Sequence, residues 1–402
     1  MIATAPGKLI LTGEYAVLDG APALVVAVNR RTVARRRTGP VGSSPFLIAV
    51  ADEIARVYGA DHPATQAAME IVVDSSAFFL GNTKLGLGSS AAVTVAATAL
   101  AIGSASGAVP VIDREAVLAI ASAAHANAQG SRPRQSSADL SKPRMRALSY
   151  SDLSAQLLVA QTTGVALSGD ASPAAKARGS GADIASAVHG GVIAFEPAGS
   201  PSLFEPPASA APTPRATPLP FPALNLDKPT ITRLAWPAGV ILLPFFTGAA
   251  ADTAELVMRV TEARETNRAA VEAALTAIAK ASRAACQACA AKTPEIAANA
   301  LIAGLELAAN ATNELAKATD LPLVPACVSK ARQEMRRMFG GTAKTTGAGG
   351  GDVAIAVIPA TRDDRQRQED VTNAERLLIE AGCQPLGLTV DTTGVDLQPD
   401  GE

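Results

Sequence analysis

Aromatic residues are scarce in this 402-residue chain, in which Phe, Trp and Tyr together make up only 3% of the sequence. Hydrophobic residues as a whole make up 48%. The sequence therefore predicts a sizeable buried core built from Ala, Val, Leu and Ile. A chain of this length typically forms two domains, or one large domain with a subdomain.

An excess of positive charge is also lacking, because 35 Lys and Arg residues stand against 37 Asp and Glu residues. The formal net charge is −2 at pH 7. Such a chain has no overall basic field that would attract nucleic acid. We therefore expect no nucleic-acid partner, and any anion-binding site must be local.

Cysteine is rare, with four residues in the chain. Cys286 and Cys289 form a C-x-x-C pair, but no second such pair and no His pair accompanies it. They lie in an Ala-rich stretch that is typical of a helix, so we interpret them as buried structural thiols; a metal or redox role is the alternative. This cysteine usage is typical of a reducing compartment.

No secretory signal or membrane anchor is evident. Lys8, Glu14 and Asp19 interrupt the first twenty residues, and no long apolar run follows them. The stretch 91–112 is apolar enough to span a membrane, but it is broken by glycines and follows a glycine-rich loop, which favours a buried helix. We expect a cytoplasmic protein without a membrane partner.

The hydrophobic pattern predicts the α+β fold class, with strands and helices mixed along the chain. Predicted strands cover residues 8–12, 24–28, 71–74, 192–195, 239–246 and 353–359. Predicted helices cover residues 47–58, 115–129, 253–291, 294–318 and 371–381, and two more follow the glycine-rich segments at 86–92 and 179–181. Asp113 is a candidate N-cap for the helix at 115–129.

Two stretches of unusual composition divide the chain. Residues 131–178 are rich in Ser, Arg, Pro and Gln and show weak periodicity, so we interpret them as an insertion. Residues 197–234 are dense in Pro, Ala and Ser, which is typical of a linker or an extended surface loop. The sequence therefore predicts domains at 1–196 and 235–402.

Residues 86–92, with the sequence Gly-Leu-Gly-Ser-Ser-Ala-Ala, form the strongest candidate for a binding loop. Glycines let the backbone approach a phosphate closely, and successive N–H groups can surround an anion. The N-terminus of the following helix adds positive partial charge, and a Ser hydroxyl could ligate Mg²⁺. The loop lacks the Gly-Lys-Ser/Thr ending of a P-loop, and a simple tight turn is the alternative.

Two further segments add to this signal. Pro6-Gly7-Lys8 opens the first predicted strand and is followed by Gly13-Glu14-Tyr15. Residues 347–352 contain four glycines in six residues, directly before an apolar strand. In isolation, a surface lysine and a flexible turn would explain them equally well.

Together, the three segments resemble in order, spacing and context the three motifs of the GHMP kinases. The resemblance covers nearly the whole chain apart from 131–178 and the Pro-rich stretch. It implies a two-domain fold, with an N-terminal ATP-binding domain, a C-terminal ferredoxin-like α/β domain and the active site between them. The implied cofactors are ATP and Mg²⁺, and the implied partner is a small-molecule substrate.

Within that superfamily the sequence is most similar to the phosphomevalonate kinases. The similarity rests on a Tyr at position 15, where mevalonate kinases usually carry His, and on a set of short segments along the chain. These segments are residues 5–8, 13–18, 20–24, 74–78, 84–88, 179–185, 190–191, 247–248 and 252–253, together with Lys344. It implies ATP-dependent phosphorylation of (R)-5-phosphomevalonate to 5-diphosphomevalonate, in the mevalonate route to isoprenoids. Another GHMP kinase activity, such as that of mevalonate kinase, and a catalytically impaired homologue are the alternatives.

The resemblance also implies a set of site residues. The implied catalytic residues are Lys8, Lys84 and Asp183. The implied ATP-binding residues are Gly86, Leu87, Gly88, Ser89, Ser90, Ala91 and Ala92, with Mg²⁺ near Ser89 or Ser90. The implied substrate-binding residues are Tyr15, Ser180, Gly181, Thr253, Lys344, Gly347, Gly349 and Gly350.

One departure from the family concerns the surroundings of Asp183. In the family, the helix at 115–129 is followed almost at once by the Gly-Ser-Gly-x-Asp segment, whereas here residues 131–178 intervene. The role of Asp183 also needs weighing, because a phosphate acceptor with a second pKa of about 6 is mostly dianionic at pH 7. We favour Asp183 as a group that orients Lys8 and Mg²⁺, with a general base as the alternative.

Overall fold

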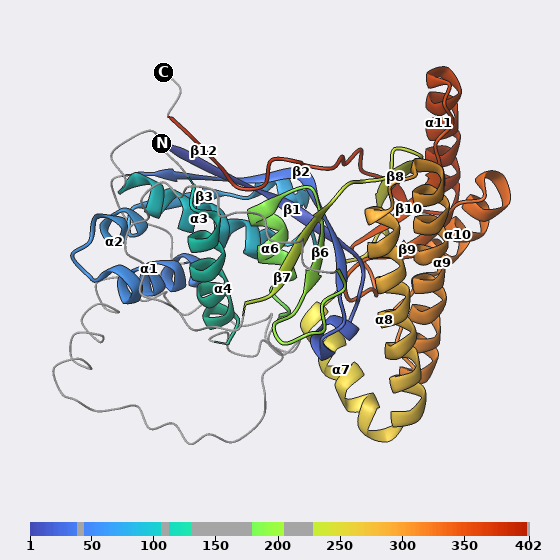
Figure 1. Ribbon diagram of the computed structural model, residues 1–402, viewed down its shortest axis with the longest axis horizontal. Coiled ribbons are helices and arrows are strands. Elements are labelled where there is room, and N and C mark those ends of the chain that lie inside the picture. The colour runs from blue at the N-terminus through green and yellow to red at the C-terminus, as the bar shows by residue number, and fades with distance from the viewer. Residues whose placement is uncertain (38–43, 106–111, 131–178, 205–227, 400–402) are drawn as a thin grey trace.

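The computed structural model describes residues 1–37, 44–105, 112–130, 179–204 and 228–399. Over these residues the chain forms two larger antiparallel β-sheets with helices packed against them, as Figure 1 shows, and a small sheet of two short strands. The predicted α+β class is therefore confirmed. The predicted insertion at 131–178 lies outside the described residues, as does the larger part of the predicted linker at 197–234.

The first sheet is built around two long paired strands, β1 (Ile2–Thr12) and β2 (Ala23–Arg36). The strand order is β12-β1-β2-β6-β7, and β3 pairs with the end of β2. The other members are β3 (Ile71–Asp74), β6 (Val192–Glu196), β7 (Thr230–Leu234) and β12 (Asp396–Gln398). The apolar runs predicted at 8–12 and 24–28 are thus the inner parts of much longer strands.

Helices cover one side of this sheet (Figure 1). They are α1 (Pro45–Tyr58), α2 (Pro63–Ala68), α3 (Ser89–Ser104), α4 (Arg114–Gly130) and α6 (Ala182–His189). Helix α3 is buried throughout residues 91–103, so the buried-helix prediction is confirmed for its described part. Among the described residues, no helix has the length and apolar character needed to cross a membrane. Asp113 caps α4 as predicted, since its carboxylate accepts from the Ala116 N–H at 3.0 Å.

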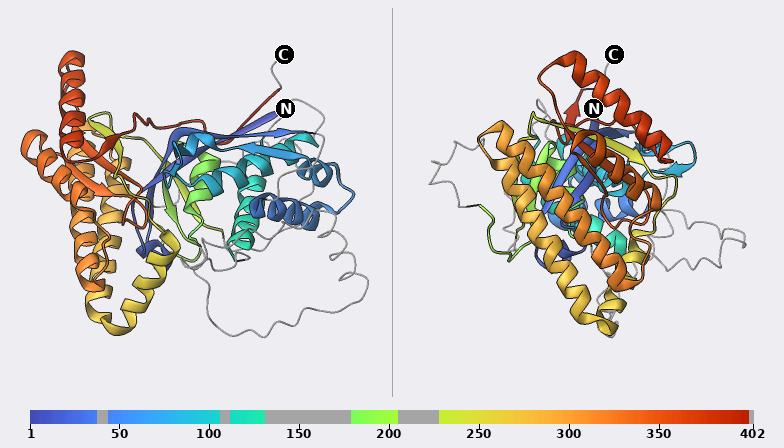
Figure 2. Two further views of the ribbon diagram at one scale, coloured as in Figure 1. Left: turned by 180° about the vertical axis from the view of Figure 1, so that it is seen from behind. Right: turned by 90° about the vertical axis from the view of Figure 1, so that its right-hand side faces the viewer.

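The second sheet has the strand order β11-β8-β10-β9. Its strands are β8 (Val240–Phe246), β9 (Thr342–Thr345), β10 (Val353–Pro359) and β11 (Gln384–Pro385). The accompanying helices are α7 (Thr253–Thr266), α8 (Arg268–Ala290), α9 (Pro294–Thr319), α10 (Ala326–Phe339) and α11 (Asp364–Glu380). Figure 2 shows α8 and α9 packed side by side as a long pair.

Two details of this half follow from single residues. The helix predicted at 253–291 is interrupted at Asn267, whose backbone is not helical, and so becomes α7 and α8. Cys286 and Cys289 are free thiols buried on α8, in agreement with the structural interpretation. Burial raises the pKa of both thiols, that of Cys289 to about 12, so neither is poised to ionise near neutral pH.

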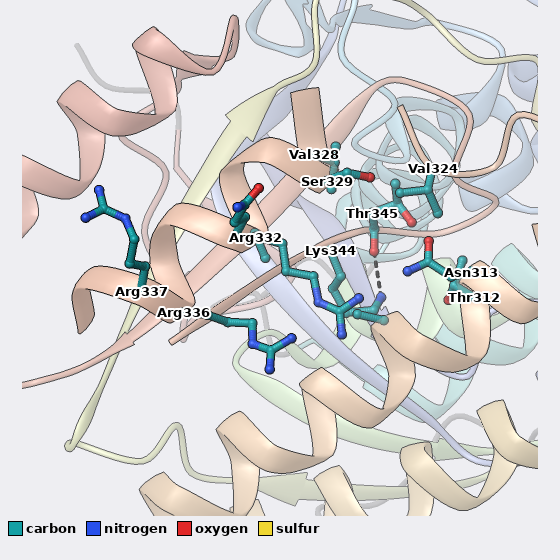
Figure 3. Close-up of a pocket in the computed structure, with 13 residues that line it drawn as sticks. Thr312, Asn313, Val324, Val328, Ser329, Arg332, Arg336, Arg337, Lys344 and Thr345 are labelled. Atoms are coloured by element: carbon teal, nitrogen blue, oxygen red, sulfur yellow. Dashed lines mark hydrogen bonds between the residues drawn. The ribbon is translucent and has the colours of Figure 1, made fainter. Parts of the chain in front are cut away.

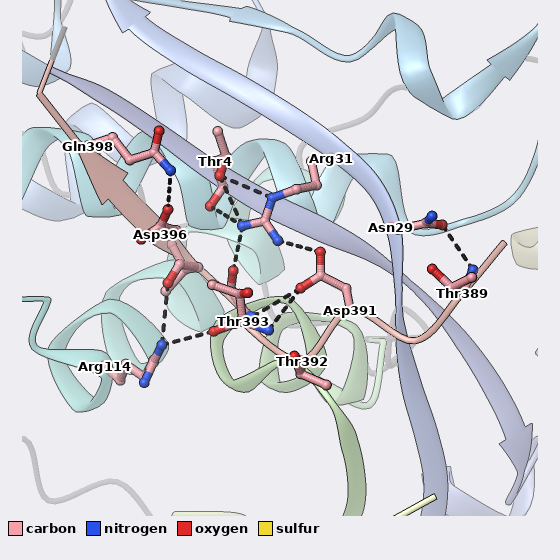
Figure 4. A network of polar contacts seen from close by, with 12 residues as sticks. Thr4, Asn29, Arg31, Arg114, Thr389, Asp391, Thr392, Thr393, Asp396 and Gln398 are labelled. Carbon is pink, nitrogen blue, oxygen red and sulfur yellow. Dashed lines mark hydrogen bonds and ion pairs between the residues drawn. The ribbon is translucent and has the colours of Figure 1, made fainter. Parts of the chain in front are cut away.

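The C-terminal segment crosses back from the second sheet to the first and ends as β12 beside β1. Arg31 holds this segment by donating to the Gly394 carbonyl at 2.6 Å and by pairing with Asp391, as Figure 4 shows. Gly190 must lack a side chain here, because a Cβ would lie 2.2 Å from the Gly394 nitrogen. Both β7 and β12 therefore belong to the first sheet, although the sequence placed them in the linker and the second domain.

The two flanks of the predicted insertion lie beside each other. The Gly179 N–H donates to the side-chain oxygen of Gln129 at 3.4 Å, at the end of α4. The closeness of the flanks is what a surface excursion between them requires.

Four short elements complete the connections between the strands and helices of the first half. They are η1 (Ala16–Asp19), η2 (Ser76–Phe78), β4 (Phe79–Leu80) and β5 (Thr83–Lys84).

We predict that deleting residues 131–176, which joins Gly130 to Ala177, leaves the protein folded. Its melting temperature should equal or slightly exceed that of the full chain, because a long loop no longer has to be closed. Circular dichroism and thermal unfolding measure this. Replacing 131–176 with a Gly-Ser linker of equal length is the control for loop length, and an insoluble deletion variant beside a folded linker variant would contradict the prediction.

Candidate active site

Lys8 lies within β1, beside the glycine-serine loop that precedes α3. The Lys8 N–H donates to the Leu87 carbonyl at 2.9 Å, which joins the first and second glycine-rich segments. Gly88 is the residue before α3 and has a positive φ of 75°. A Cβ at Gly88 would lie 3.0 Å from Cε of Lys8, so the lysine side chain crosses the bare backbone there. This glycine therefore places a cation at the start of a helix.

Asp183 lies in the first turn of α6 and faces the same lysine. Its Oδ2 is 3.6 Å from Lys8 Nζ, and the Lys8 and Asp183 side chains are 11% and 32% exposed. The helix starts at Gly181, with a positive φ of 86°, and the Ser180 hydroxyl accepts from the Ala182 N–H at 3.3 Å. Ser180 and Gly181, expected to bind substrate, thus also form the turn that aims Asp183 at Lys8.

Asp352 is a second carboxylate at the site, and sequence reasoning left it out of the candidate residues although it ends the third glycine-rich segment. A Cβ at Gly86 would lie 2.3 Å from Asp352 Oδ2, so the second and third segments meet here. Its Oδ1 accepts from the Ala251 N–H at 3.2 Å. Burial raises the pKa of Asp352, while the charges of Lys8 and of the exposed Lys84 oppose the rise.

The two serines at the start of α3 have different surroundings. Ser89 is buried, and Ser90 Oγ lies 3.1 Å from Nε2 of His125 on α4. The His125 ring in turn stacks on Phe46 of α1, with ring centroids 5.2 Å apart. In the described part of the chain no cluster of three His, Cys, Asp or Glu side chains could hold a metal ion. Any Mg²⁺ here would therefore depend on hydroxyl, carboxylate and ligand oxygens together.

Comparison with solved structures identifies the fold. The Lin0012 protein from Listeria innocua superposes with a TM-score of 0.66 at 20% identity, with all of both chains covered. Streptococcus pneumoniae phosphomevalonate kinase in complex with phosphomevalonate and AMPPNP gives 0.62 at 15% identity, over 97% of this chain and 99% of that one. L. major mevalonate kinase in complex with R-mevalonate gives 0.54 at 15% identity, over 97% and 96%.

The chain has the GHMP kinase fold. This agrees with the fold that the three sequence motifs implied. Neither a protein-family model nor a curated protein matches the sequence. At these identities the structural likeness establishes the fold, so the assignment of activity depends on what the site residues can do.

Within the GHMP kinase fold, Lys344 occupies a different place from the substrate-binding position expected of it. It is 2% exposed and forms an ion pair with Glu14, whose side chain is equally buried. Its Nζ also donates to the carbonyls of Leu11 at 2.8 Å and Thr345 at 2.6 Å. All three ammonium donors are engaged, so this side chain is not available to a substrate phosphate. Burial raises the pKa of Glu14, and Lys344 opposes the rise.

Tyr15 and Gly347 likewise join the first segment to the third. The Tyr15 hydroxyl donates to the Ala348 carbonyl at 2.6 Å, and the Gly347 N–H donates to the Ile10 carbonyl at 3.2 Å. Tyr15 has a positive φ of 55°, an uncommon conformation for a residue with a side chain. The Tyr15 hydroxyl, expected to bind substrate, is therefore engaged with the protein itself. Gly347 differs, because a Cβ built on it would meet no atom within 4 Å, so the space beside this residue is open.

Gly349 and Gly350 are required by the protein's own packing. A Cβ at Gly349 would lie 2.4 Å from the Leu323 carbonyl oxygen, which accepts from the Gly350 N–H at 2.8 Å. Thr253, another expected substrate-binding residue, is exposed at the first position of α7. The structure thus brings Lys8 and Asp183 together beside residues 86–90. Lys344, Gly349 and Gly350 instead contact other parts of the protein and hold the third glycine-rich segment, residues 347–352, in place.

We predict that Lys344→Met destabilises the protein by about 3–5 kcal/mol, because it leaves the Glu14 carboxylate buried without a partner. Urea unfolding measures the loss. The variant loses the charge and the hydrogen bond of Lys344 that oppose the effect of burial, so the folded-state pKa of Glu14 rises further above that of the unfolded chain. A carboxyl of this kind stabilises below its unfolded pKa and loses that contribution as pH rises, so the deficit should be larger at pH 8 than at pH 5.

The double variant Glu14→Gln/Lys344→Met is the control for this prediction. It removes both charges, so it should recover part of the stability lost in the single variant and lose the pH dependence of the deficit. A Lys344→Met protein as stable as the wild type at pH 8 would show that the pair does not hold the two sheets together.

Proposed function

We propose that the protein is an ATP-dependent small-molecule kinase that transfers the γ-phosphoryl group to (R)-5-phosphomevalonate, giving 5-diphosphomevalonate and ADP. One observation carries the proposal, namely the meeting of Lys8 and Asp183 at the start of α3, beside the loop at 86–92. The fold adds support, since a protein of the same fold was solved with phosphomevalonate and AMPPNP. A cytoplasmic role in isoprenoid synthesis is part of the same proposal.

The ATP phosphates fit at the N-terminus of α3. The Ala92 N–H already donates to the Gly88 carbonyl, so the first free N–H groups of the helix, those of residues 89–91, and the helix dipole favour negative charge at this point. The Ser89 and Ser90 hydroxyls and the Asp183 carboxylate are hard oxygen donors of the kind that Mg²⁺ prefers, so these residues would hold it. When bound, Mg²⁺ supplies charge neutralisation on the ATP phosphates.

Lys8 and Lys84 would neutralise the transferred group and the acceptor phosphate. Because a phosphate acceptor with a second pKa of about 6 is mostly dianionic at neutral pH, little proton removal is needed. Asp183 would then act by orienting Lys8, to which it is already close. Phosphoryl transfer depends mainly on such positioning and charge stabilisation.

The identity of the acceptor and the role of Lys8 can be tested in one coupled ADP-release assay. The wild type should give a higher kcat/KM with phosphomevalonate than with mevalonate. Lys8→Met should lower kcat on the order of 10²-fold or more, because it removes a charge beside the transferred group. Circular dichroism controls for folding of the variant. The reverse substrate preference would reassign the acceptor, and no turnover with either compound would indicate a catalytically impaired homologue.

The contact between Gly88 and Lys8 can be tested by adding a side chain at Gly88. Gly88→Ala should raise the KM for ATP roughly tenfold or more, because the new Cβ displaces Lys8 from the loop. Gly340→Ala is the matched control, since Gly340 is in the same left-handed region as Gly88, with φ 68° and ψ 19°, but meets no atom within 4 Å of a Cβ. Equal KM values in the two variants would show that the contact between Gly88 and Lys8 does not position the nucleotide site.

A further inference from the structure

A cavity of about 570 Å³ lies between α9 and α10, over the edge strand β9. None of the residues that surround Lys8 and Asp183 at the candidate active site lines it. Its volume is in the range of small-molecule sites, which is about 300–1,000 Å³. Figure 3 shows its lining, which α9, α10 and the end of β9 contribute together.

The charged lining of this cavity is entirely basic. It includes Arg332, Arg336, Arg337 and Lys344, and no Asp or Glu is among the described residues that line it. All four cations pair with carboxylates outside the lining: Arg337 with Glu334, Lys344 with Glu14, and both Arg332 and Arg336 with Glu306. Because Glu306 is one carboxylate shared by two arginines, one positive charge remains for a ligand at Arg332 and Arg336.

Arg336 and Arg337 differ in direction although they are neighbours. Figure 3 shows the Arg336 side chain extended toward α9 with Arg332, whereas Arg337 points to the opposite side. Arg336 is 62% exposed and shares Glu306 at 3.2 Å, while Arg337 pairs with Glu334 at 2.6 Å. Arg336 is thus the guanidinium placed to meet an anion in the cavity.

The neutral lining indicates what else the ligand carries. Asn313 and Ser329 offer an amide and a hydroxyl group, while the half-buried Val324 adds apolar surface. A guanidinium presents paired N–H donors whose spacing matches two oxygens of a phosphate. A phosphate head on Arg336 and a short apolar stem against Val324 would satisfy both kinds of lining.

We propose that this cavity is a second ligand site, for a small phosphorylated molecule with a short apolar stem. Lys344 and Thr345, both buried, lie beneath this cavity, and their strand β9 leads to the third glycine-rich segment. The site is independent of the proposed kinase reaction, and it is tested by binding alone.

Butyl phosphate and inorganic phosphate are the probes, titrated at constant ionic strength and followed by ³¹P NMR. Butyl phosphate should bind more tightly than inorganic phosphate, and Arg336→Gln should weaken it about tenfold through loss of charge-assisted hydrogen bonds. Ser329→Trp, at an exposed lining residue, should abolish binding by filling the cavity. Arg337→Gln removes the same charge from the adjacent residue and should have less than about a twofold effect, because its side chain makes no such bond to the ligand.

Lys8→Met separates this site from the candidate active site. Butyl phosphate binding that survives Lys8→Met and fails in Arg336→Gln supports the proposal. Binding that fails in Lys8→Met and survives in Arg336→Gln would place the phosphate at the loop before α3 and overturn it. Equal weakening by Arg336→Gln and Arg337→Gln would show that only the net charge of α10 attracts the phosphate, and would overturn the proposal. Absence of saturable binding would overturn it as well.

Discussion

The arrangement of the site depends on the buried ion pair between Lys344 of β9 and Glu14, two residues beyond the end of β1, which joins the second sheet to the turn that follows the first strand. Removing two charges from water is costly, and a buried pair stabilises only when its remaining hydrogen-bonding groups are satisfied. Here the ammonium also donates to two backbone carbonyls, one of them on β1, whereas Oε2 of Glu14 is buried with no hydrogen-bond partner among the described residues, so Lys344 is the main group that compensates this carboxylate. The pair therefore fixes where β9 ends relative to β1, and so where the third glycine-rich segment begins.

Glycines of the second and third glycine-rich segments are required by contacts within the protein itself. Gly88 makes room for Lys8, Gly86 makes room for the Asp352 carboxylate, and Gly349 makes room for the Leu323 carbonyl. Each contact would be closed by a single Cβ, because the atoms involved would lie 3.0 Å or less from it. A glycine-rich motif that suggests a ligand-binding loop in the sequence therefore also allows segments far apart in the chain to pack closely against each other.

The parts that the sequence predicted are those with a local signal. Periodic apolar runs indicated β8, β10, α1 and α9, and the motifs indicated Lys8 and Asp183. The parts that it missed depend on partners far along the chain. Strand β9 is four residues with the sequence Thr-Ala-Lys-Thr, and β12 is three residues that pair with β1 at the other end of the chain. Lys344 suggested a substrate ligand because nothing nearby reveals that its partner is Glu14, 330 residues away.

The same reasoning changes which residues bear on the choice of acceptor. Tyr15 favoured a phosphate acceptor by resemblance, but its hydroxyl is bonded to the Ala348 carbonyl, so its chemistry is directed at the loop. The remaining difference between an alcohol and a phosphate acceptor is electrostatic, because an alcohol must lose a proton while a phosphate dianion must be held beside ATP against repulsion. The charges of Lys8 and Lys84 lower the pKa of Asp352, against the effect of its burial. The proposed phosphate acceptor therefore depends on whether these two lysines, rather than Tyr15 or Lys344, hold the acceptor beside ATP.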